Sequence, residues 1–165
     1  MTETYSNAFL LNLLHSVQTI AMVGASPNWN RPSYFAMKYL QAKGYRVIPV
    51  NPRAAGETIL GELTYASLSD VPSPIDMVDI FRNSEAAGPI TDEAIGIAKE
   101  KGIRVIWMQL GVINEAAAGR ARAAGLEVVM DRCPKIEFGR LHSELSWGGF
   151  NSGVITAKRQ RLKSA

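Results

Sequence analysis

The residues best suited to chemistry follow short apolar runs of the sequence, and the first group centres on a glycine. Gly24, Ala25 and Ser26 come directly after the apolar run 19–23 and precede Pro32, a residue typical of a first helical turn. Glycine permits close backbone approach, and free N–H groups at a helix start attract phosphate. The second glycine of a G-x-G-x-x-G motif is missing, so a plain tight turn is the alternative.

A second group follows the next apolar run, 45–50. Domains that bind NAD usually carry an acidic residue here, where it holds the ribose hydroxyls. This sequence instead has Asn51, with Arg53 two residues later. A cation at this place favours a ligand with a phosphate on its ribose, which includes NADP and coenzyme A. The alternative is an arginine that faces solvent on an exposed loop.

The remaining polar residues do not form a catalytic constellation. Asp76 and Asp79 lie on one predicted strand but face opposite sides, so they are not an acid–base pair. No H-x-x-H or C-x-x-C spacing indicates a metal site, and no G-x-S-x-G elbow is present. We expect His15 to be a surface or interface residue and His142 to follow the folded core, neither acting as a phosphorylated nucleophile.

Apolar periodicity and glycine, proline or asparagine punctuation predict alternating strands and helices. The predicted strands are 19–23, 45–50, 75–81, 103–107 and 126–130, with a short one at 58–60. The predicted helices are 8–17, 32–43, 84–101, 115–124 and 134–141, with Ser84 and Asn114 as caps. This order predicts a doubly wound, three-layer α/β fold of Rossmann type, with a mostly parallel sheet of about five strands. All the polar groups that follow the strands would then line one rim, where ligands bind.

Composition limits the classes that need to be considered. The 165 residues are 47% apolar, which fits a single domain over residues 1–165 with a folded core at about 17–140. No apolar stretch is long enough to span a membrane, the N-terminus lacks the basic flank of a secretory signal, and the one cysteine fits the cytoplasm. Basic residues gather in the tail, which we expect to be solvated rather than to bind nucleic acid: Lys158, Arg159, Arg161 and Lys163.

Five motifs together give the sequence a family resemblance. They are 23–26, 31–33, 44–52, 107–111 and 130–137. In this order they resemble the compact bacterial and archaeal CoA-binding family, which is related to the CoA-binding domain of the succinyl-CoA synthetase alpha subunit. The resemblance covers about residues 17–140 and implies a Rossmann-like fold with coenzyme A as the ligand.

The resemblance also implies roles for individual residues. The loop 24–26 and the following helix start, with Arg31 and Ser33, would receive the CoA phosphates, and Asn51 and Arg53 would lie near the adenosine. The groove for the nucleotide or the pantetheine arm would be lined by four residues: Phe81, Arg82, Met108 and Gln109. The predicted site is completed by Gly111, Arg132 and Cys133. The synthetase's second domain, which carries its phosphorylated histidine, has no counterpart here, so ligase activity is not implied.

Cys133 carries a separate hypothesis. Arg132 and Lys135 are its neighbours, and we expect their charges to lower the thiol pKa and favour the thiolate. A thiolate beside bound CoA could form a mixed disulfide with the CoA thiol. The alternative is a small residue packed at a helix start.

The sequence thus predicts a module that binds coenzyme A or an acyl-CoA in a sensing or regulatory role, without catalytic machinery. An NADP-dependent oxidoreductase, or another nucleotide-using enzyme on the same scaffold, is the alternative. A third reading is an interaction subunit with a vestigial CoA site. A module of this kind implies an enzyme partner, and the apolar helix 8–17 suggests contact with a second copy of the chain.

Overall fold

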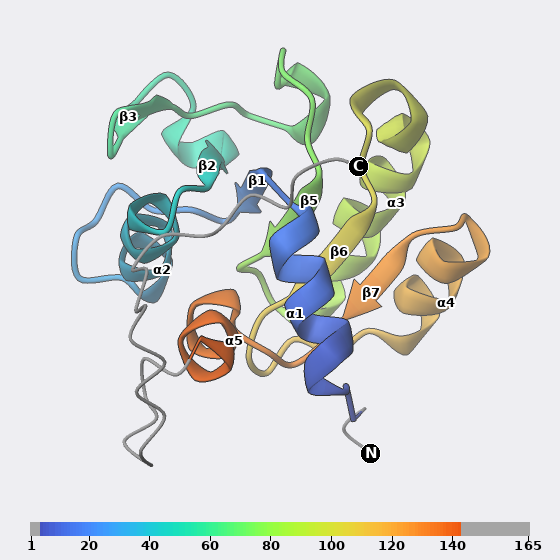
Figure 1. The fold of residues 1–165 in the computed structure, drawn as a ribbon. Helices are drawn as coiled ribbons and strands as arrows, with labels where there is room; N and C mark the ends of the chain where they lie inside the picture. Colours follow the sequence, from blue (N-terminus) through green and yellow to red (C-terminus); the bar gives the residue numbers. More distant parts are fainter. Residues whose placement is uncertain (1–3, 143–165) are drawn as a thin grey trace, which may run out of the picture.

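The computed structural model describes residues 4–142 and is built on one parallel sheet (Figure 1). Its strand order is β2-β1-β5-β6-β7, and every neighbouring pair is parallel. The strands are β1 (Thr19–Val23), β2 (Arg46–Val50), β5 (Met77–Ile80), β6 (Val105–Met108) and β7 (Glu127–Val129). All five strands predicted from apolar runs are present, and the α/β class is confirmed.

In the described part of the chain, five helices cover the two faces of this sheet (Figure 1). They are α1 (Asn7–Ser16), α2 (Pro32–Ala42), α3 (Ser84–Lys101), α4 (Glu115–Ala123) and α5 (Pro134–Leu141). One apolar cluster joins α1, α2 and α5 to one face of the sheet, through residues such as Leu14, Met37 and Phe138. A second cluster joins α3 and α4 to the other face, through Ala94 and Ala118. The result is the predicted three-layer arrangement.

The winding reverses between β1 and β5. From β1 the chain passes through α2 to the edge strand β2, whereas from β5 it passes through α3 and α4 to β6 and β7 on the other side. Because α2 and the pair α3 and α4 lie on opposite faces, the sheet is doubly wound, with its switch point between β1 and β5. Ligands of such sheets bind beyond the carboxyl ends of the strands near this point.

The connection from β2 to β5 contains only short elements. A 3₁₀ turn at Pro52–Ala54 follows β2, and a two-stranded hairpin pairs β3 (Thr58–Ile59) with β4 (Glu62–Leu63). The sequence predicted the first of these strands but not the second. Pro49 lies in β2 in register with Met22, and β2 is an edge strand, as a proline in a ladder requires.

Two predictions about the helices are wrong in detail. Asn83, not Ser84, caps α3, because the Asn83 side chain accepts from the Ala86 N–H at 2.7 Å. The apolar side of α1 is not exposed for contact with a second copy of the chain. Leu10, Leu13 and Leu14 are buried in the protein's own core, so the apolarity of this helix gives no evidence for a dimer.

Helices α1 and α5 also meet through the two histidines. The Nε2 atoms of His15 and His142 lie 2.7 Å apart, and the His142 ring stacks on Phe138. His142 ends α5, and His15 lies in the last turn of α1. These residues therefore link two helices on one face of the sheet, a contact that their 127-residue separation in sequence did not indicate.

The described part of the chain has no helix that is both long and apolar enough to cross a membrane. The basic tail residues predicted to be solvated lie outside the described residues.

Gly24 brings the ends of β1 and β5 together. Its φ is +90°, and a Cβ atom placed on it would lie 2.3 Å from the carbonyl oxygen of Phe81. Gly44 has a similar φ of +98°, yet a Cβ there would have nothing within 4 Å. Gly24 is therefore required by the packing of the two strand ends as well as by its backbone conformation.

This comparison predicts unequal effects of two alanine substitutions. Gly44→Ala should cost about 1–2 kcal/mol, the cost of a side chain in the left-handed region. Gly24→Ala should cost more than about 3 kcal/mol, because the strand ends must also separate. Urea denaturation of both variants measures the difference. Equal losses would show that the strand ends tolerate a methyl group between them.

Candidate functional site

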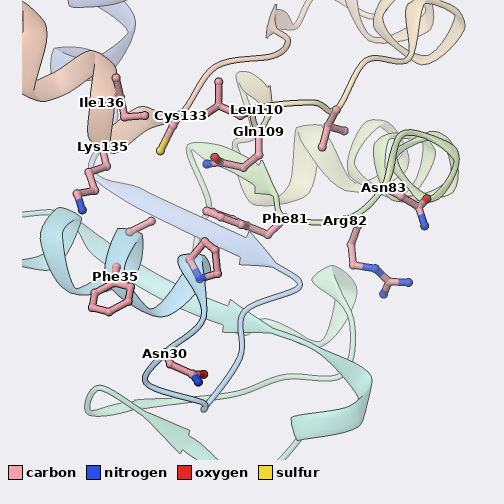
Figure 2. Close-up of a pocket in the computed structure, with 13 residues that line it drawn as sticks. Asn30, Phe35, Phe81, Arg82, Asn83, Gln109, Leu110, Cys133, Lys135 and Ile136 are labelled. Carbon is pink, nitrogen blue, oxygen red and sulfur yellow. The ribbon is translucent and has the colours of Figure 1, made fainter.

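A pocket of about 850 Å³ lies beyond the carboxyl ends of β5, β6 and β7 (Figure 2). The first turns of α2 and α5 form its walls, on the sheet face that these helices cover. Thirteen residues line it: Asn30, Pro32, Phe35, Ala36, Phe81, Arg82, Asn83, Gln109, Leu110, Val112, Cys133, Lys135 and Ile136. Its place beside the switch point is the one expected for a ligand site in this fold.

The lining is mainly apolar, with a cation at either end. Figure 2 shows Arg82 and Asn83 on one side and Lys135 with Ile136 on the other, with Phe81 and Gln109 between them. Among the described residues, no acidic side chain lines the pocket. Such a site suits a ligand with an anionic part and a long, less polar part.

A buried carboxyl group lies behind the pocket. Asp79, in β5, is fully buried, and the Gln109 Nε2 donates to its two oxygens at 2.9 and 3.2 Å. Burial raises the pKa of Asp79 from 3.8 to about 7, and the hydrogen bond from Gln109 opposes that rise. Gln109 is itself 5% exposed and lines the pocket, so the bond fixes its amide in place.

Cys133 lies in the pocket wall at the N-cap of α5, and Figure 2 shows its sulfur turned to the same side as the Gln109 amide. Burial raises the pKa of its thiol, and the charge of Asp79 adds to the rise. The N–H groups of Ile136 and Lys135 and the Lys135 charge act in the opposite direction but do not prevail. The expectation of a lowered pKa is therefore wrong, and the mixed-disulfide hypothesis loses its electrostatic basis.

The loop after β1 is held closed by its own side chains. The Ser26 N–H donates to the buried Ser33 hydroxyl, and the Asn28 N–H donates to the Ser26 hydroxyl. The Asn51 amide nitrogen donates to the Ala25 carbonyl at 2.9 Å, while its oxygen accepts from the Arg53 N–H. Ser33 and Asn51 thus shape the loop: the Ser33 bond joins it to the first turn of α2, and the Asn51 bond joins it to the end of β2.

Three arginines of the predicted site are placed differently. Arg31, the N-cap of α2, and Arg53 are both exposed and lie outside the pocket lining. Arg82 is exposed and lines the pocket, and its Cδ lies 3.0 Å from the position that a Cβ on Gly24 would take. Arg82 is therefore the side chain that connects the pocket with the β1 loop.

Three other predicted residues do not line the pocket. Met108 is fully buried among the residues under α3 and α4, so the prediction that it lines the groove is wrong. The Gly111 N–H donates to the Asp131 carboxylate at 2.7 Å. The Arg132 guanidinium lies 5.5 Å from the centre of the Tyr5 ring and donates to the Asp131 carbonyl. Of the fourteen predicted residues the pocket contains four: Phe81, Arg82, Gln109 and Cys133.

Sequence reasoning missed several lining residues. Phe35 lies in the predicted helix 32–43, and its apolar character predicts burial, but it is 48% exposed and lines the pocket. Leu110 and Ile136 are 58% and 45% exposed and lie on the same pocket. Asp79 was considered only as a partner for Asp76. A charged residue inside an otherwise apolar central strand was the signal that could have singled it out.

Comparison with known families agrees with the geometry. The family model described as "CoA binding domain" matches residues 18–139, most of the chain. The fold is a doubly wound parallel sheet, and its pocket lies at the carboxyl edge, as in nucleotide-binding domains of this class. The chain therefore belongs to the CoA-binding domain family, and the resemblance identified from sequence motifs is confirmed.

Individual relatives cover nearly the same length. The chain is 35% identical to the uncharacterized protein YneT of Bacillus subtilis (strain 168) over 131 residues. This alignment covers 79% of this chain and 93% of YneT. Among solved structures, Prb, the PH1109 protein redesigned for binding, has a TM-score of 0.77 and 37% identity, covering 84% of this chain and 94% of its own. The cell-free ID.343 protein of Thermus thermophilus has a TM-score of 0.77 and 35% identity, covering 83% and 99%.

The buried carboxyl of Asp79 predicts a pH-dependent difference between the protein and an Asp79→Asn variant. Because the folded-state pKa is raised, the folded protein binds the proton more tightly, and stability falls as pH rises from about 4 to about 7. An uncharged asparagine amide can pair with Gln109 and lacks this penalty. The variant should therefore gain stability over the wild type across this range, by roughly 4 kcal/mol at most above pH 7.

Urea denaturation of both proteins at several pH values between 4 and 8 measures the effect. A stability difference that does not change with pH would contradict the assignment of the titration to Asp79.

Proposed function

We propose that this protein binds coenzyme A or an acyl-CoA as a binding, sensing or regulatory module without catalysis of its own. The pantetheine arm lies in the pocket, and the phosphates lie at the β1 loop beside Arg82. Membership of the CoA-binding domain family supports the ligand, and the shape and charge of the site support this placement.

The position of Arg82 is the observation that carries the proposal. Its side chain borders both the pocket and Gly24, and within residues 4–142 its guanidinium makes no hydrogen bond or ion pair. An unpaired arginine at the switch point suits a phosphate, which it can bind through two parallel hydrogen bonds. From there the apolar lining leads to Cys133, a path that matches a ligand with phosphates at one end and a thiol at the other.

Arg53 suits the ribose phosphate of the adenosine end. It lies in the 3₁₀ turn directly after β2, and Asn51 joins this turn to the β1 loop. The Arg53 side chain is exposed and has no partner among the described residues, so it is free to meet an anion. Coenzyme A carries a phosphate on its ribose and NADP does too, so Arg53 by itself does not separate them.

The pocket favours coenzyme A over NADP. A nicotinamide riboside is short and rich in hydroxyl groups, whereas the described lining of this pocket is mainly apolar and includes no carboxylate to hold a ribose. Within residues 4–142 the rim holds no paired catalytic acid and base, which favours a module that acts with an enzyme partner. The single cysteine supports a cytoplasmic location.

Titration calorimetry of ligand-free protein tests the proposal directly. Coenzyme A should bind with micromolar or tighter affinity, and NADP should give no signal at the same concentrations. Binding of NADP in preference to coenzyme A would overturn the proposal in favour of an oxidoreductase. Absence of binding by both would mean that the family fold is retained with another ligand.

A substitution of Arg53 tests the adenosine end. Arg53→Ala should weaken coenzyme A by about ten-fold or more, the value of one charge-assisted contact, and leave dephospho-CoA nearly unchanged. Arg120→Ala is the matched control, because Arg120 is an exposed arginine on α4 that pairs with Asp92. Equal losses of affinity for coenzyme A and dephospho-CoA would show that Arg53 does not contact the ribose phosphate.

The single cysteine reports on the thiol end. Because burial raises its pKa, Cys133 should react slowly with iodoacetamide at pH 7 and faster as the pH rises toward 9. Saturating coenzyme A should slow the reaction further by covering the thiol, with mass spectrometry as the readout. A rate that coenzyme A does not change would place the pantetheine arm elsewhere.

A further inference from the structure

The pocket is larger than a pantetheine arm requires. At about 30 Å³ for each non-hydrogen atom, the share of one water molecule in the liquid, a volume of about 850 Å³ holds roughly 28 such atoms. Pantetheine has about 18 non-hydrogen atoms, so room for roughly ten more is left. In the proposed function the phosphates lie at the mouth of the pocket beside Arg82, and the adenosine lies at the β1 and β2 loops, so the part of the pocket away from Arg82 is left for the pantetheine thiol and what it carries.

The spare room lies at the end away from Arg82. There Figure 2 shows Phe35, Cys133 and Ile136, contributed by the first turns of α2 and α5. Phe35 and Ile136 present apolar surface, and the Cys133 thiol is neutral because burial raises its pKa. Apart from the Lys135 ammonium group, this end of the pocket therefore offers mainly apolar surface.

Exposed apolar side chains are concentrated around this pocket. Six large apolar side chains are exposed in the described part of the chain, and three of them line the pocket: Phe35, Leu110 and Ile136. Apolar surface gathered at one concave place marks a site that an apolar ligand group covers. Free coenzyme A ends in a thiol and would leave much of this surface in water.

Charge at this end does not indicate an anionic acyl group. Lys135 is the cation there, and its Nζ lies 5.7 Å from the centre of the Tyr39 ring, which it contacts as a cation over an aromatic face. The other polar side chain in reach, Gln109, is occupied on its nitrogen by Asp79. The Lys135 charge is thus engaged by an aromatic face, and the exposed apolar side chains Phe35, Leu110 and Ile136 outnumber it in the lining, which favours a hydrocarbon chain.

From these observations, and resting on the proposed function, we infer that the preferred ligand is an acyl-CoA with an uncharged apolar acyl group of up to about ten non-hydrogen atoms. The acyl chain lies between Phe35 and Ile136 at the end of the pocket away from Arg82. The protein therefore distinguishes acyl-CoA from free coenzyme A, and free coenzyme A is the weaker ligand.

A chain-length series tests this inference. Calorimetric Kd values are measured for coenzyme A and for its acetyl, butyryl, hexanoyl and octanoyl thioesters. Affinity should rise by about two- to four-fold for each methylene that enters the pocket. Adipoyl-CoA, which equals hexanoyl-CoA in length but ends in a carboxylate, should bind at least about ten-fold more weakly than hexanoyl-CoA.

Two matched variants locate the acyl group. Ile136→Ala should reduce the ratio of hexanoyl-CoA affinity to coenzyme A affinity by about three- to ten-fold. Ile113→Ala, at an isoleucine that is 39% exposed but does not line the pocket, should leave the ratio unchanged.

The outcomes separate the inference from the proposed function. Equal Kd values for coenzyme A and all its thioesters, or tighter binding of adipoyl-CoA than of hexanoyl-CoA, would overturn the apolar acyl assignment while CoA binding stands. A length preference that Ile113→Ala abolishes and Ile136→Ala does not would also overturn it. Absence of binding by every member of the series would instead refute the proposed function.

Discussion

At the carboxyl edge of the sheet, β1 and β5 end with their backbones in contact. A Cβ on Gly24 would lie 2.3 Å from the Phe81 carbonyl oxygen, too close for any side chain, so only glycine fits at this position. Because the winding reverses at this pair of strands, the helix after β1 and the helix after β5 leave on opposite faces. Phe81 and Arg82 then follow β5 directly into the pocket. The close contact thus sets where the pocket begins and which arginine lies at its entrance.

A polar pair lies beneath a pocket that is otherwise apolar. Burying the Asp79 carboxyl is unfavourable when it is charged, which is why its pKa is raised to about 7. Gln109 is the residue that compensates, with one amide nitrogen placed near both carboxyl oxygens. A buried amide held in this way presents a fixed orientation to a ligand, whereas an amide in water would rotate. The buried Asp79 carboxyl thus lowers the free energy of unfolding near neutral pH, and the same carboxyl holds the Gln109 amide in place.

The sequence predicted the order of elements well because apolar runs and their punctuation are local signals. It predicted the rim, since parallel strands end at one edge. It did not predict which rim side chains share a face. Met108 and Gln109 are adjacent, and successive side chains of a strand point to opposite faces, so only one of them could enter the pocket. The place of Phe35 in the pocket lining could not be predicted, for a different reason. Its apolar character predicts burial, and only the tertiary structure shows that its helix turn borders a cavity.

The two helices that wall the pocket start differently from the other three. Helix α1, which lies on the same face of the sheet, is capped by Ser6, whose hydroxyl accepts from the Phe9 N–H. On the face with α3 and α4, Asn83 and Asn114 cap the helices and accept the N–H groups of Ala86 and Ala117. The helices that wall the pocket, α2 and α5, begin with prolines and have no side-chain cap at Arg31 or Cys133. Their first free N–H groups need an acceptor other than a cap. A bound ligand with phosphate and carbonyl oxygens supplies such acceptors. At the starts of α1, α3 and α4, an N–H group of each helix is already bonded to its side-chain cap. The capping pattern therefore favours ligand binding on the α2 and α5 side of the switch point, where the pocket lies.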